Sequence, residues 1–488
     1  MSIARNSRYN LIGSIIPIIL ALATVPIYLH FVGQDRFGVL SIAWLFLGYF
    51  GLFDLGLGRA TTYQISALRD GDPAEQAEVF WSAILVNIGM GLVGAIVLWL
   101  VSQYFFQSIF KVDARLRPEI LAAVPLLAAS VPVATMTGVL TGTLIGKDRF
   151  LEVNMLSVTS TALFQIFPLG VAWLIGPNIS GLLAAALAAR ATAIAAMWIQ
   201  CHRLVLRGQP VRFSSGRARS LLGYGGWVTL TSIFSPMLVI VDRFAIGAVL
   251  GSAAVTVYTV PFQIAQRISI IPTALVGAIF PRLPSADREE QSRLTGKALL
   301  VLSSLLGPPI MAAIFIIHPF LDLWVGRDIG TQAAPIARLI ILGFWANAFA
   351  IVPYGRLQGT GRPDLVTKVL LIEIPFYLAG LYFGMKQFGL VGCAFALAIR
   401  FAVDFILLSF AAAGKLDKAG LLAANALLLC AGAVVASILP YQGAALWIAS
   451  VPLLAAISWL AWANMPAELR AQIDIVLGKL RRGRRSEA

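Results

Sequence analysis

The chain has 488 residues, of which 59% are hydrophobic and only 12% are charged. A soluble core of this size does not need so much apolar surface, so the composition indicates a membrane protein. The net charge of +14 would suggest nucleic-acid binding in a soluble chain, but here the basic residues sit in short loops between apolar runs. We therefore interpret the charge as a signal of membrane orientation and expect no nucleic-acid partner.

Apolar runs of about twenty residues, the length that crosses a hydrocarbon layer of about 30 Å, recur along the whole chain. Lipid offers the backbone no hydrogen-bond partners, so each run should be a helix. The sequence thus predicts an all-α polytopic membrane protein with about fourteen transmembrane helices. In chain order, the predicted spans are 9–32, 37–64, 79–101, 120–145, 151–175, 179–206, 221–250, 255–280, 294–317, 333–357, 365–385, 389–413, 421–439 and 444–462.

The 37 lysines and arginines are divided unevenly between the two ends of these spans. The two termini and the loops on their side hold 26, the opposite loops hold seven, among them Arg327 and Arg338, and four lie inside spans. Basic residues accumulate on the cytoplasmic side, so both termini should be cytoplasmic, which requires an even number of spans. We expect a bacterial inner-membrane protein that passes the membrane many times.

The chain also repeats itself. Strings that contain Gly142 and Gly355 match at an offset of 213 residues, and the Ala-rich runs that end in Arg190 and Arg400 match at an offset of 210. The offset covers six spans, an even number, so the two halves should run in the same direction across the membrane. Two such lobes beside a central cavity are a common transporter plan.

This repeat suggests a division of the chain into five segments. We expect an N-terminal lobe of spans one to six at 1–206, a cytoplasmic linker at 207–220 and a C-terminal lobe of spans seven to twelve at 221–413. Two extra spans should follow at 419–464, and a basic cytoplasmic tail at 465–488.

Ionisable side chains inside spans are costly and usually face protein or water, so they are candidates for a functional site. A cationic cavity could hold an anionic substrate, and the planar guanidinium fork suits a diphosphate. Arg267 is the strongest candidate, because no acid lies one turn away and Gln263 and Gln266 share its helical face. The other candidate cations are Arg243, Arg59, Arg190 and Arg400.

Three acidic residues inside spans are candidates for binding a coupling ion or a proton: Asp54, Asp242 and Glu373. Structural pairing is the alternative for several of these charges. Arg243 could pair with its neighbour Asp242, and Asp404 lies one turn after Arg400. Prolines within spans one, seven and eight predict kinks, which are either static or act as hinges.

Several classes of function are disfavoured. The three cysteines and three histidines are scattered, so we expect no disulfide framework, no metal site and no cofactor. The sequence has no Gly-Lys-Ser or Gly-Lys-Thr phosphate loop, which argues against ATP hydrolysis by this chain. No loop is long enough for a catalytic domain outside the membrane. We therefore expect a transporter and not an enzyme.

Three strings carry a resemblance to a known family. Residues 51–56 read Gly-Leu-Phe-Asp-Leu-Gly, residues 242–243 read Asp-Arg, and residues 278–283 read Ala-Ile-Phe-Pro-Arg-Leu. From about Asn10 to Lys415 the chain resembles bacterial polysaccharide-biosynthesis export proteins, the O-antigen flippases of Wzx type. These belong to the multidrug/oligosaccharidyl-lipid/polysaccharide (MOP) exporter superfamily.

The resemblance implies a V-shaped bundle of two lobes, with spans one, two, seven and eight lining a cavity. The implied substrate is an undecaprenyl-diphosphate-linked oligosaccharide, an O-antigen or exopolysaccharide repeat unit. Alternating access would flip it from the cytoplasmic to the periplasmic leaflet. The resemblance also implies coupling to a proton or sodium gradient, and cooperation with a polysaccharide polymerase and a chain-length regulator.

Other functions stay open at this point. Many members of the superfamily have twelve spans, whereas the peptidoglycan lipid II flippases also have fourteen, so lipid II is an alternative substrate. A cation-coupled multidrug exporter is another alternative, although unpaired arginines would repel cationic drugs. A polysaccharide polymerase or ligase would normally carry a long periplasmic loop.

Overall fold

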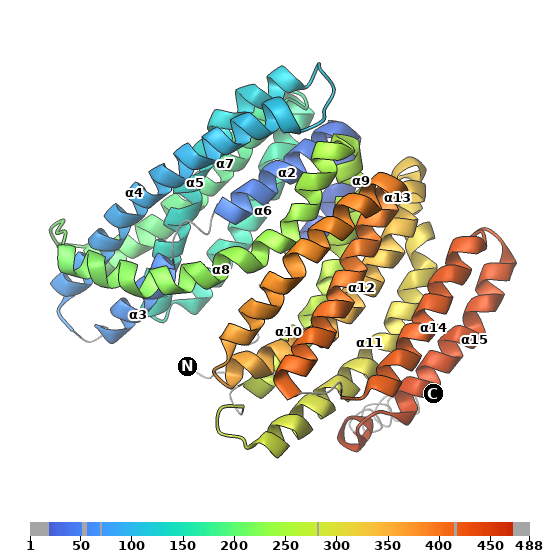
Figure 1. Ribbon diagram of the computed structural model, residues 1–488. Helices are drawn as coiled ribbons and strands as arrows, with labels where there is room; N and C mark the ends of the chain where they lie inside the picture. Colours follow the sequence, from blue (N-terminus) through green and yellow to red (C-terminus); the bar gives the residue numbers. More distant parts are fainter. Residues whose placement is uncertain (1–18, 51–55, 69–70, 281–282, 414–416, 472–488) are drawn as a thin grey trace, which may run out of the picture. The chain divides into compact units, whose positions relative to one another are not determined.

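The computed structural model describes residues 19–50, 56–68, 71–280, 283–413 and 417–471, and every regular element in these ranges is a helix (Figure 1). Two compact units divide the chain, Met1–Thr256 and Val257–Ala488. The boundary falls inside a helix and not in the linker expected at 207–220. Compact units need not coincide with repeat-related lobes, so the lobe assignment stays a prediction.

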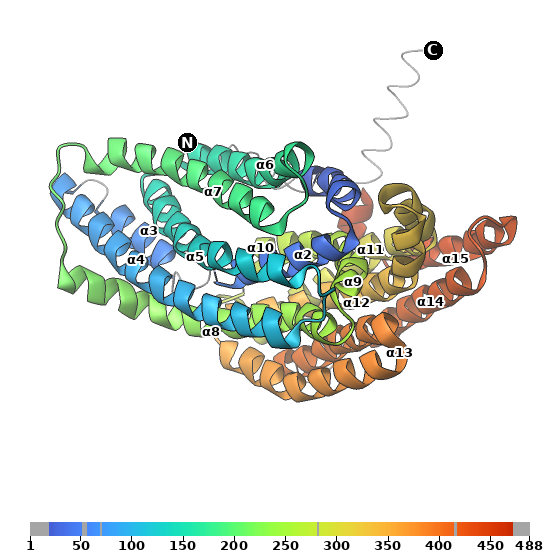
Figure 2. The ribbon, with the colours of Figure 1, turned by 90° about the horizontal axis from the view of Figure 1, so that it is seen from above.

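The first unit contains the helices of the first seven predicted spans. They are Ile19–Val32, α2 (Gln34–Phe50), α3 (Leu57–Ala67), α4 (Pro73–Tyr104) with a π-helical turn at Phe105–Ile109, α5 (Arg117–Gly146), α6 (Phe150–Leu174), α7 (Ile179–Cys201) with a π-helical turn at His202–Leu206, and α8 (Ser215–Val249). Within this unit α4, α5 and α7 lie side by side in both views (Figures 1 and 2).

The second unit begins within α9 (Ser252–Ala265). It continues through a 3₁₀ turn (Gln266–Ser269), α10 (Ile270–Ile279), α11 (Arg288–Val325), α12 (Arg327–Gly359), α13 (Pro363–Ala413), α14 (Ala419–Ile438) and α15 (Ala444–Ala463). α13 contains two predicted spans that meet at Gly389, whose φ of +57° turns the chain back.

The all-α polytopic fold predicted from the sequence is confirmed. Ten helices in the described ranges are long and apolar enough to cross a membrane. The total of fourteen spans stays a prediction.

Several helices extend beyond the apolar runs that predicted them, because polar residues cap them. Asp72 accepts a hydrogen bond from the N–H of Ala74 at 2.9 Å, and Pro73 occupies the first helical position of α4. Asp287 accepts from the N–H of Glu290 at 2.8 Å at the start of α11. Both helices therefore start six residues before the predicted span.

Glycines on one face allow the same close helix packing in each unit. α5 packs on α3, and a methyl group on Gly142 would lie 2.2 Å from the carbonyl oxygen of Gly58. α12 packs on α10, and a methyl group on Gly355 would lie 2.3 Å from Cγ1 of Val276. Gly58 and Val276 are 218 residues apart, close to the offset of 213 between the two glycines. This packing supports the internal repeat.

The two extra helices pack on α11 within the second unit (Figure 1). The buried Asn425 of α14 donates a hydrogen bond from its amide to Oγ of Ser303 in α11 at 2.7 Å. On the same side of α11, Met311 fills the space beside Gly432. A hydrogen bond between buried polar side chains is costly to break in an apolar setting, so it holds α14 against α11 in one register.

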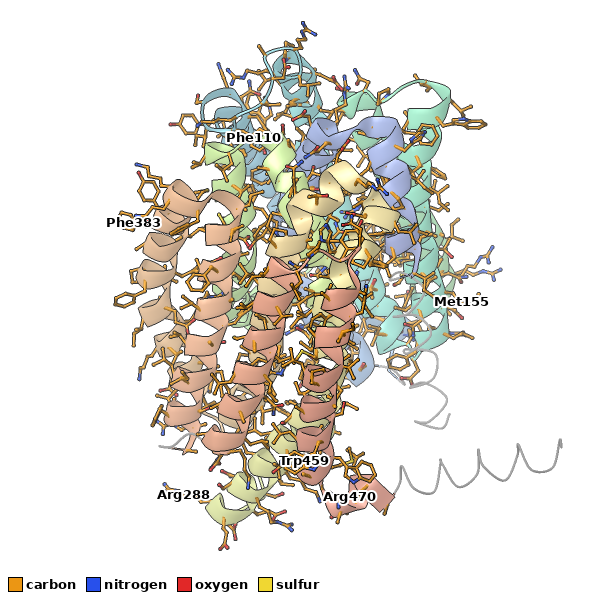
Figure 3. The ribbon with its side chains drawn as sticks, turned by 90° about the vertical axis from the view of Figure 1, so that its right-hand side faces the viewer. Phe110, Met155, Arg288, Phe383, Trp459 and Arg470 are labelled. Atoms are coloured by element: carbon orange, nitrogen blue, oxygen red, sulfur yellow. The ribbon has the colours of Figure 1, made fainter. Side chains whose placement is uncertain are left out.

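Large apolar side chains cover the outside of both units, as lipid contact requires. Met155 on α6, Phe383 on α13 and Trp459 on α15 are 62%, 61% and 71% exposed and project outwards (Figure 3). Figure 3 also places Arg288, at the start of α11, and Arg470, after α15, at the same end of the second unit. This is the arrangement expected for an alternating series of spans.

Candidate functional site

The helix of predicted span eight, continuous over Ser252–Ile279, tightens into a 3₁₀ turn where Arg267 lies. α9 and α10 are joined by the 3₁₀ turn Gln266–Ser269. Pro272 has no N–H to donate to the carbonyl of Ile268, and its ring crowds that carbonyl, which weakens the α-helical hydrogen bonding at this point. The turn therefore places a guanidinium group beside backbone that has left the α-helical hydrogen-bonding pattern.

Arg267 is half-buried, as are Gln263 and Gln266. The described residues place no carboxylate at ion-pair distance from Arg267 and no aromatic ring beneath it. Ser269, two residues on, is held to α12 by a 3.4 Å hydrogen bond that Asn347 donates to its hydroxyl. The cation therefore sits on an anchored turn with no counter-charge from the described protein.

Predicted span two is divided in two. α2 is described as far as Phe50, and α3 begins at Leu57, after Gly56 with a φ of +70°. Arg59 lies in the first turn of α3 and is exposed, and no described residue forms an ion pair with it. Asp54, a candidate for ion coupling, lies outside the described residues.

Arg243 and Asp242 are both buried in α8 and contact each other. The Arg243 Nε lies 3.7 Å from Oδ1 of Asp242, and the same oxygen accepts the backbone N–H of Arg243 at 2.8 Å. This is the neighbouring pair that the sequence left open as the structural alternative. A direct role of either residue in substrate or ion binding stays a prediction.

Arg190 of α7 lies in apolar surroundings. Its guanidinium stacks over the ring of Phe164 in α6, with 4.9 Å between its central carbon and the ring centroid. Leu47, Leu127 and Leu183 line the same small cavity. No carboxylate of the described chain pairs with Arg190. A cation–π contact of this kind partly compensates a desolvated guanidinium but leaves its net charge in place.

Arg400 has a different environment at the repeat-related position. Its Nε lies 3.7 Å from Oε2 of Glu373, across the α13 hairpin, and its guanidinium stacks over Tyr377 at 5.1 Å. Asp404 interacts electrostatically with both Glu373 and Arg400. The residue at ion-pair distance is thus Glu373, from the preceding span, whereas the sequence suggested Asp404. The cluster holds two carboxyl groups and one guanidinium.

The structure buries two arginines that sequence reasoning had left out of the candidate site. Arg338 and Arg356 are 5% and 7% exposed and both lie within α12, although Arg338 was counted in the loops opposite the termini and neither was a candidate for the site. Placing Arg338 in a loop was wrong because α12 is helical from Arg327 to Gly359 and both side chains face its packed side. Their position inside the predicted span 333–357 was the signal that could have identified them.

The arginines therefore fall into two groups. Arg243 and Arg400 are neutralised by carboxylates, whereas Arg267, Arg59 and Arg190 have no acidic partner among the described residues. An unneutralised guanidinium that is partly shielded from water binds phosphate or carboxylate oxygens strongly. Each of these guanidinium groups can therefore bind an anion.

Comparison with known proteins gives consistent family matches. The family described as "Polysaccharide biosynthesis protein" matches residues 3–286, and the MatE family matches residues 228–377. A Shigella flexneri protein named "Putative O-antigen transporter" is 29% identical over 414 residues, which cover 84% of this chain and 97% of that protein. The Haloferax volcanii protein named "Probable low-salt glycan biosynthesis flippase Agl15" is 26% identical over 39% of this chain and 41% of its own length.

Solved structures show the same fold at low sequence identity. The lipid II flippase MurJ in an inward closed conformation has a TM-score of 0.68 at 12% identity, over 94% of this chain and 98% of that chain. An inward-facing multidrug transporter of the MATE family has a TM-score of 0.64 at 16% identity, over 80% of this chain and 92% of that chain. The fold is therefore that of the MOP superfamily.

Proposed function

We propose that this chain, which belongs to the polysaccharide biosynthesis protein family, flips an undecaprenyl-diphosphate-linked oligosaccharide across the bacterial inner membrane. The glycan would be an O-antigen or exopolysaccharide repeat unit, moved from the cytoplasmic to the periplasmic leaflet by alternating access. The name of the Shigella flexneri relative, with 97% of its length covered, supports this class of cargo. Both termini would lie in the cytoplasm. A polysaccharide polymerase and a chain-length regulator in the same membrane are further candidate partners.

The observation that carries the proposal is the environment of Arg267. This half-buried guanidinium lies on a 3₁₀ turn, and no acidic residue in the described part of the chain pairs with it. A diphosphate presents several oxygens to such a fork, and each charge-assisted hydrogen bond contributes about 1.5–3 kcal/mol. A 3₁₀ stretch inside an α-helix often marks a functional hinge or local strain. Within the first unit, Arg59 on α3 and Arg190 on α7 likewise have no described acidic partner.

Substituting Arg267 tests the proposal. In cells that lack the native gene, Arg267→Ala should reach the membrane at a normal level, fail to restore surface polysaccharide and leave the undecaprenyl-linked glycan in the cytoplasmic leaflet. Arg267→Lys should restore export in part, because it keeps the charge but loses the fork. Arg293→Ala is the matched control, since Arg293 is exposed and pairs with Glu290 outside the apolar core. Full export by a well-expressed Arg267→Ala protein would remove Arg267 from the site.

Lipid II is a second candidate cargo, and one feature favours it. The MurJ structure matches 94% of this chain, so α14 and α15 cannot both lie wholly outside the match. The likeness shows the fold alone, so we rank lipid II below the oligosaccharide. Complementation decides between them: growth of cells depleted of their own lipid II flippase, together with normal surface polysaccharide after deletion of this gene, would favour lipid II. A rise in drug sensitivity with normal surface polysaccharide would instead favour a multidrug exporter.

We further propose that Glu373 binds the proton that drives transport. Arg400 and Asp404 are the charged groups that face Glu373 from the second half of the α13 hairpin, and within the described chain no other charged group joins them. Two carboxylates beside one guanidinium carry a net charge of −1, and one bound proton makes the buried cluster neutral. The cluster is thus built to exchange a proton at low cost.

Proteoliposomes with an imposed gradient test this coupling. A pH gradient should accelerate flipping by the wild type and by Glu373→Asp, but not by Glu373→Gln, which cannot release a proton. Glu373→Gln should still bind substrate, because it leaves Arg267 unchanged. Acceleration of Glu373→Gln by the pH gradient, or acceleration of the wild type by sodium alone, would contradict the assignment.

A further inference from the structure

A polar cavity of about 490 Å³ lies in the second unit, away from Arg267. It is formed by the end of α11, the first three turns of α12 and the turn between α14 and α15. The two extra helices therefore build one of its walls. The residues that argue for its function are His318, Asp322, Arg327, Arg338, Ser437 and Tyr441.

Arg338 forms the floor of this cavity. It is 5% exposed, and one of its terminal nitrogens donates a 3.2 Å hydrogen bond to Oγ of Ser437 in the last turn of α14. Its Nε is buried without a hydrogen-bond partner, and no carboxylate in the described ranges forms an ion pair with it. Burying a guanidinium whose N–H group has no acceptor costs free energy, and an anion that accepts this hydrogen bond removes the cost.

Asp322, the acidic residue that lines the cavity, contacts Tyr441 and His318. Asp322 accepts a 2.6 Å hydrogen bond from the hydroxyl of Tyr441, and His318 lies 3.8 Å from its other oxygen. Arg327 stands exposed on the same face of α12 as Arg338, three turns nearer the start of the helix. With one carboxylate and two guanidinium groups, the cavity has a net charge of +1 while His318 is neutral.

Aromatic residues place the cavity at the depth of lipid headgroups. Trp447, at the start of α15, is 41% exposed and donates a 3.0 Å hydrogen bond from its indole nitrogen to the carbonyl of Tyr441. Trp324, in the last turn of α11, stacks on Phe320 at 5.5 Å. Tryptophan collects at the membrane–water interface; here Trp447 is bonded to the cavity residue Tyr441, and Trp324 lies two residues after Asp322 in the chain.

We propose that this cavity binds the phosphate group of an anionic phospholipid, with Arg338 at its floor and Arg327 at its mouth. The guanidinium groups match phosphate oxygens, and the tryptophans set the phosphate of a lipid headgroup at the same level. A small soluble phosphate ion offers the same chemistry, and the experiment separates the two sources. The site lies apart from the Arg267 turn, so it is a second binding site and does not depend on the nature of the transported glycan.

Lipid adducts on the purified full-length protein test the site. Native mass spectrometry in detergent would compare phosphatidylglycerol with phosphatidylcholine as probes, with and without inorganic phosphate. We expect the affinity for phosphatidylglycerol to fall about tenfold or more in Arg338→Gln, as the loss of one charge-assisted hydrogen bond predicts, and several-fold in Arg327→Gln. Arg356→Gln is the matched control, because Arg356 is buried at the other end of the same helix.

The outcomes decide between the sources. Competition of inorganic phosphate with phosphatidylglycerol supports a phosphate site that lipid occupies. Binding of inorganic phosphate without preference for phosphatidylglycerol overturns the lipid assignment, and equal lipid binding by wild type, Arg327→Gln and Arg356→Gln overturns the site altogether. Arg327 is exposed, so its variant gives this answer even if Arg338→Gln does not fold.

Discussion

Arg190 and Arg400 occupy matching positions in the two halves of the repeat, yet their surroundings differ. Arg190 stacks on Phe164 in an apolar cavity with no described carboxylate beside it. Arg400 pairs with Glu373 at 3.7 Å, and Asp404 interacts with both. The repeat thus preserves the position of a guanidinium within a span but not its counter-charge. Arg190 therefore keeps an unneutralised charge, whereas Arg400 belongs to a cluster of charges.

The largest effect should come from Arg400→Ala. Removing the guanidinium leaves Glu373 and Asp404 together in a buried site, and breaking a buried ion pair in this way typically costs about 3–5 kcal/mol. We expect a clear fall in the unfolding midpoint in detergent and low protein levels. A double variant, Arg400→Ala with Glu373→Gln, should recover part of the loss. Wild-type stability of Arg400→Ala would show that the cluster is not a paired unit.

The second-largest effect should come from alanine substitutions of the repeat-related glycines Gly142 and Gly355, and the loss of stability should differ between them. In Gly142→Ala the new methyl group meets the backbone oxygen of Gly58, which cannot rotate away, so we expect a loss near the upper end of the range of about 1–3 kcal/mol for overpacking. In Gly355→Ala it meets the side chain of Val276, which can adjust, so the loss should be smaller. Unfolding midpoints of the two variants provide the measurement. Equal losses would indicate that both helix pairs adapt in the same way.

Arg190→Ala should affect stability less than Arg400→Ala. It removes a cation–π contact, which contributes about 0.5–2 kcal/mol, and it leaves no carboxylate of the described residues without its ion-pair partner. We expect a modest shift of the unfolding midpoint with a larger loss of glycan export. Arg190→Lys keeps the charge and serves as the control. A stability loss equal to that of Arg400→Ala would mean that Arg190 has a structural role like its counterpart.

The smallest effect is expected for Lys368→Ala, at the start of the same helix as Glu373. Lys368 and Asp364 form an exposed pair at 3.2 Å, and exposed pairs of this kind contribute little because water and salt screen them. The unfolding midpoint should not change measurably. A shift comparable with that of Arg400→Ala would show that the assay reports charge in general and not burial.

The sequence predicted most of the fold. Some helices match the predicted spans closely, as α6 at Phe150–Leu174 does for a prediction of 151–175, because about twenty apolar residues in a row leave the chain few alternatives in lipid. The irregularities within spans were less predictable. Pro272 was a visible signal for the turn at Arg267, but the separation of α2 from α3 depends on local backbone geometry around Gly56.

For the candidate site, the sequence identified charges but not partners. It proposed Arg243 with Asp242 correctly as a neighbouring pair, since adjacent residues need no tertiary information. It suggested Asp404 for Arg400, whereas the carboxylate at 3.7 Å is that of Glu373, 27 residues earlier. Residues this far apart meet only when the hairpin closes at Gly389.

By itself, then, the sequence determined the membrane setting, the helical spans and the set of intramembrane charges, because hydrophobic length and charge placement are local properties of the chain. The tertiary structure decided which of those charges are neutralised, because a guanidinium and a carboxylate must approach within a few ångströms from separate helices. Arg338 shows the difference most clearly. The charge count placed it outside the membrane although it lies within the predicted span 333–357, and the packing of α11, α12 and α14 makes it the buried floor of a polar cavity.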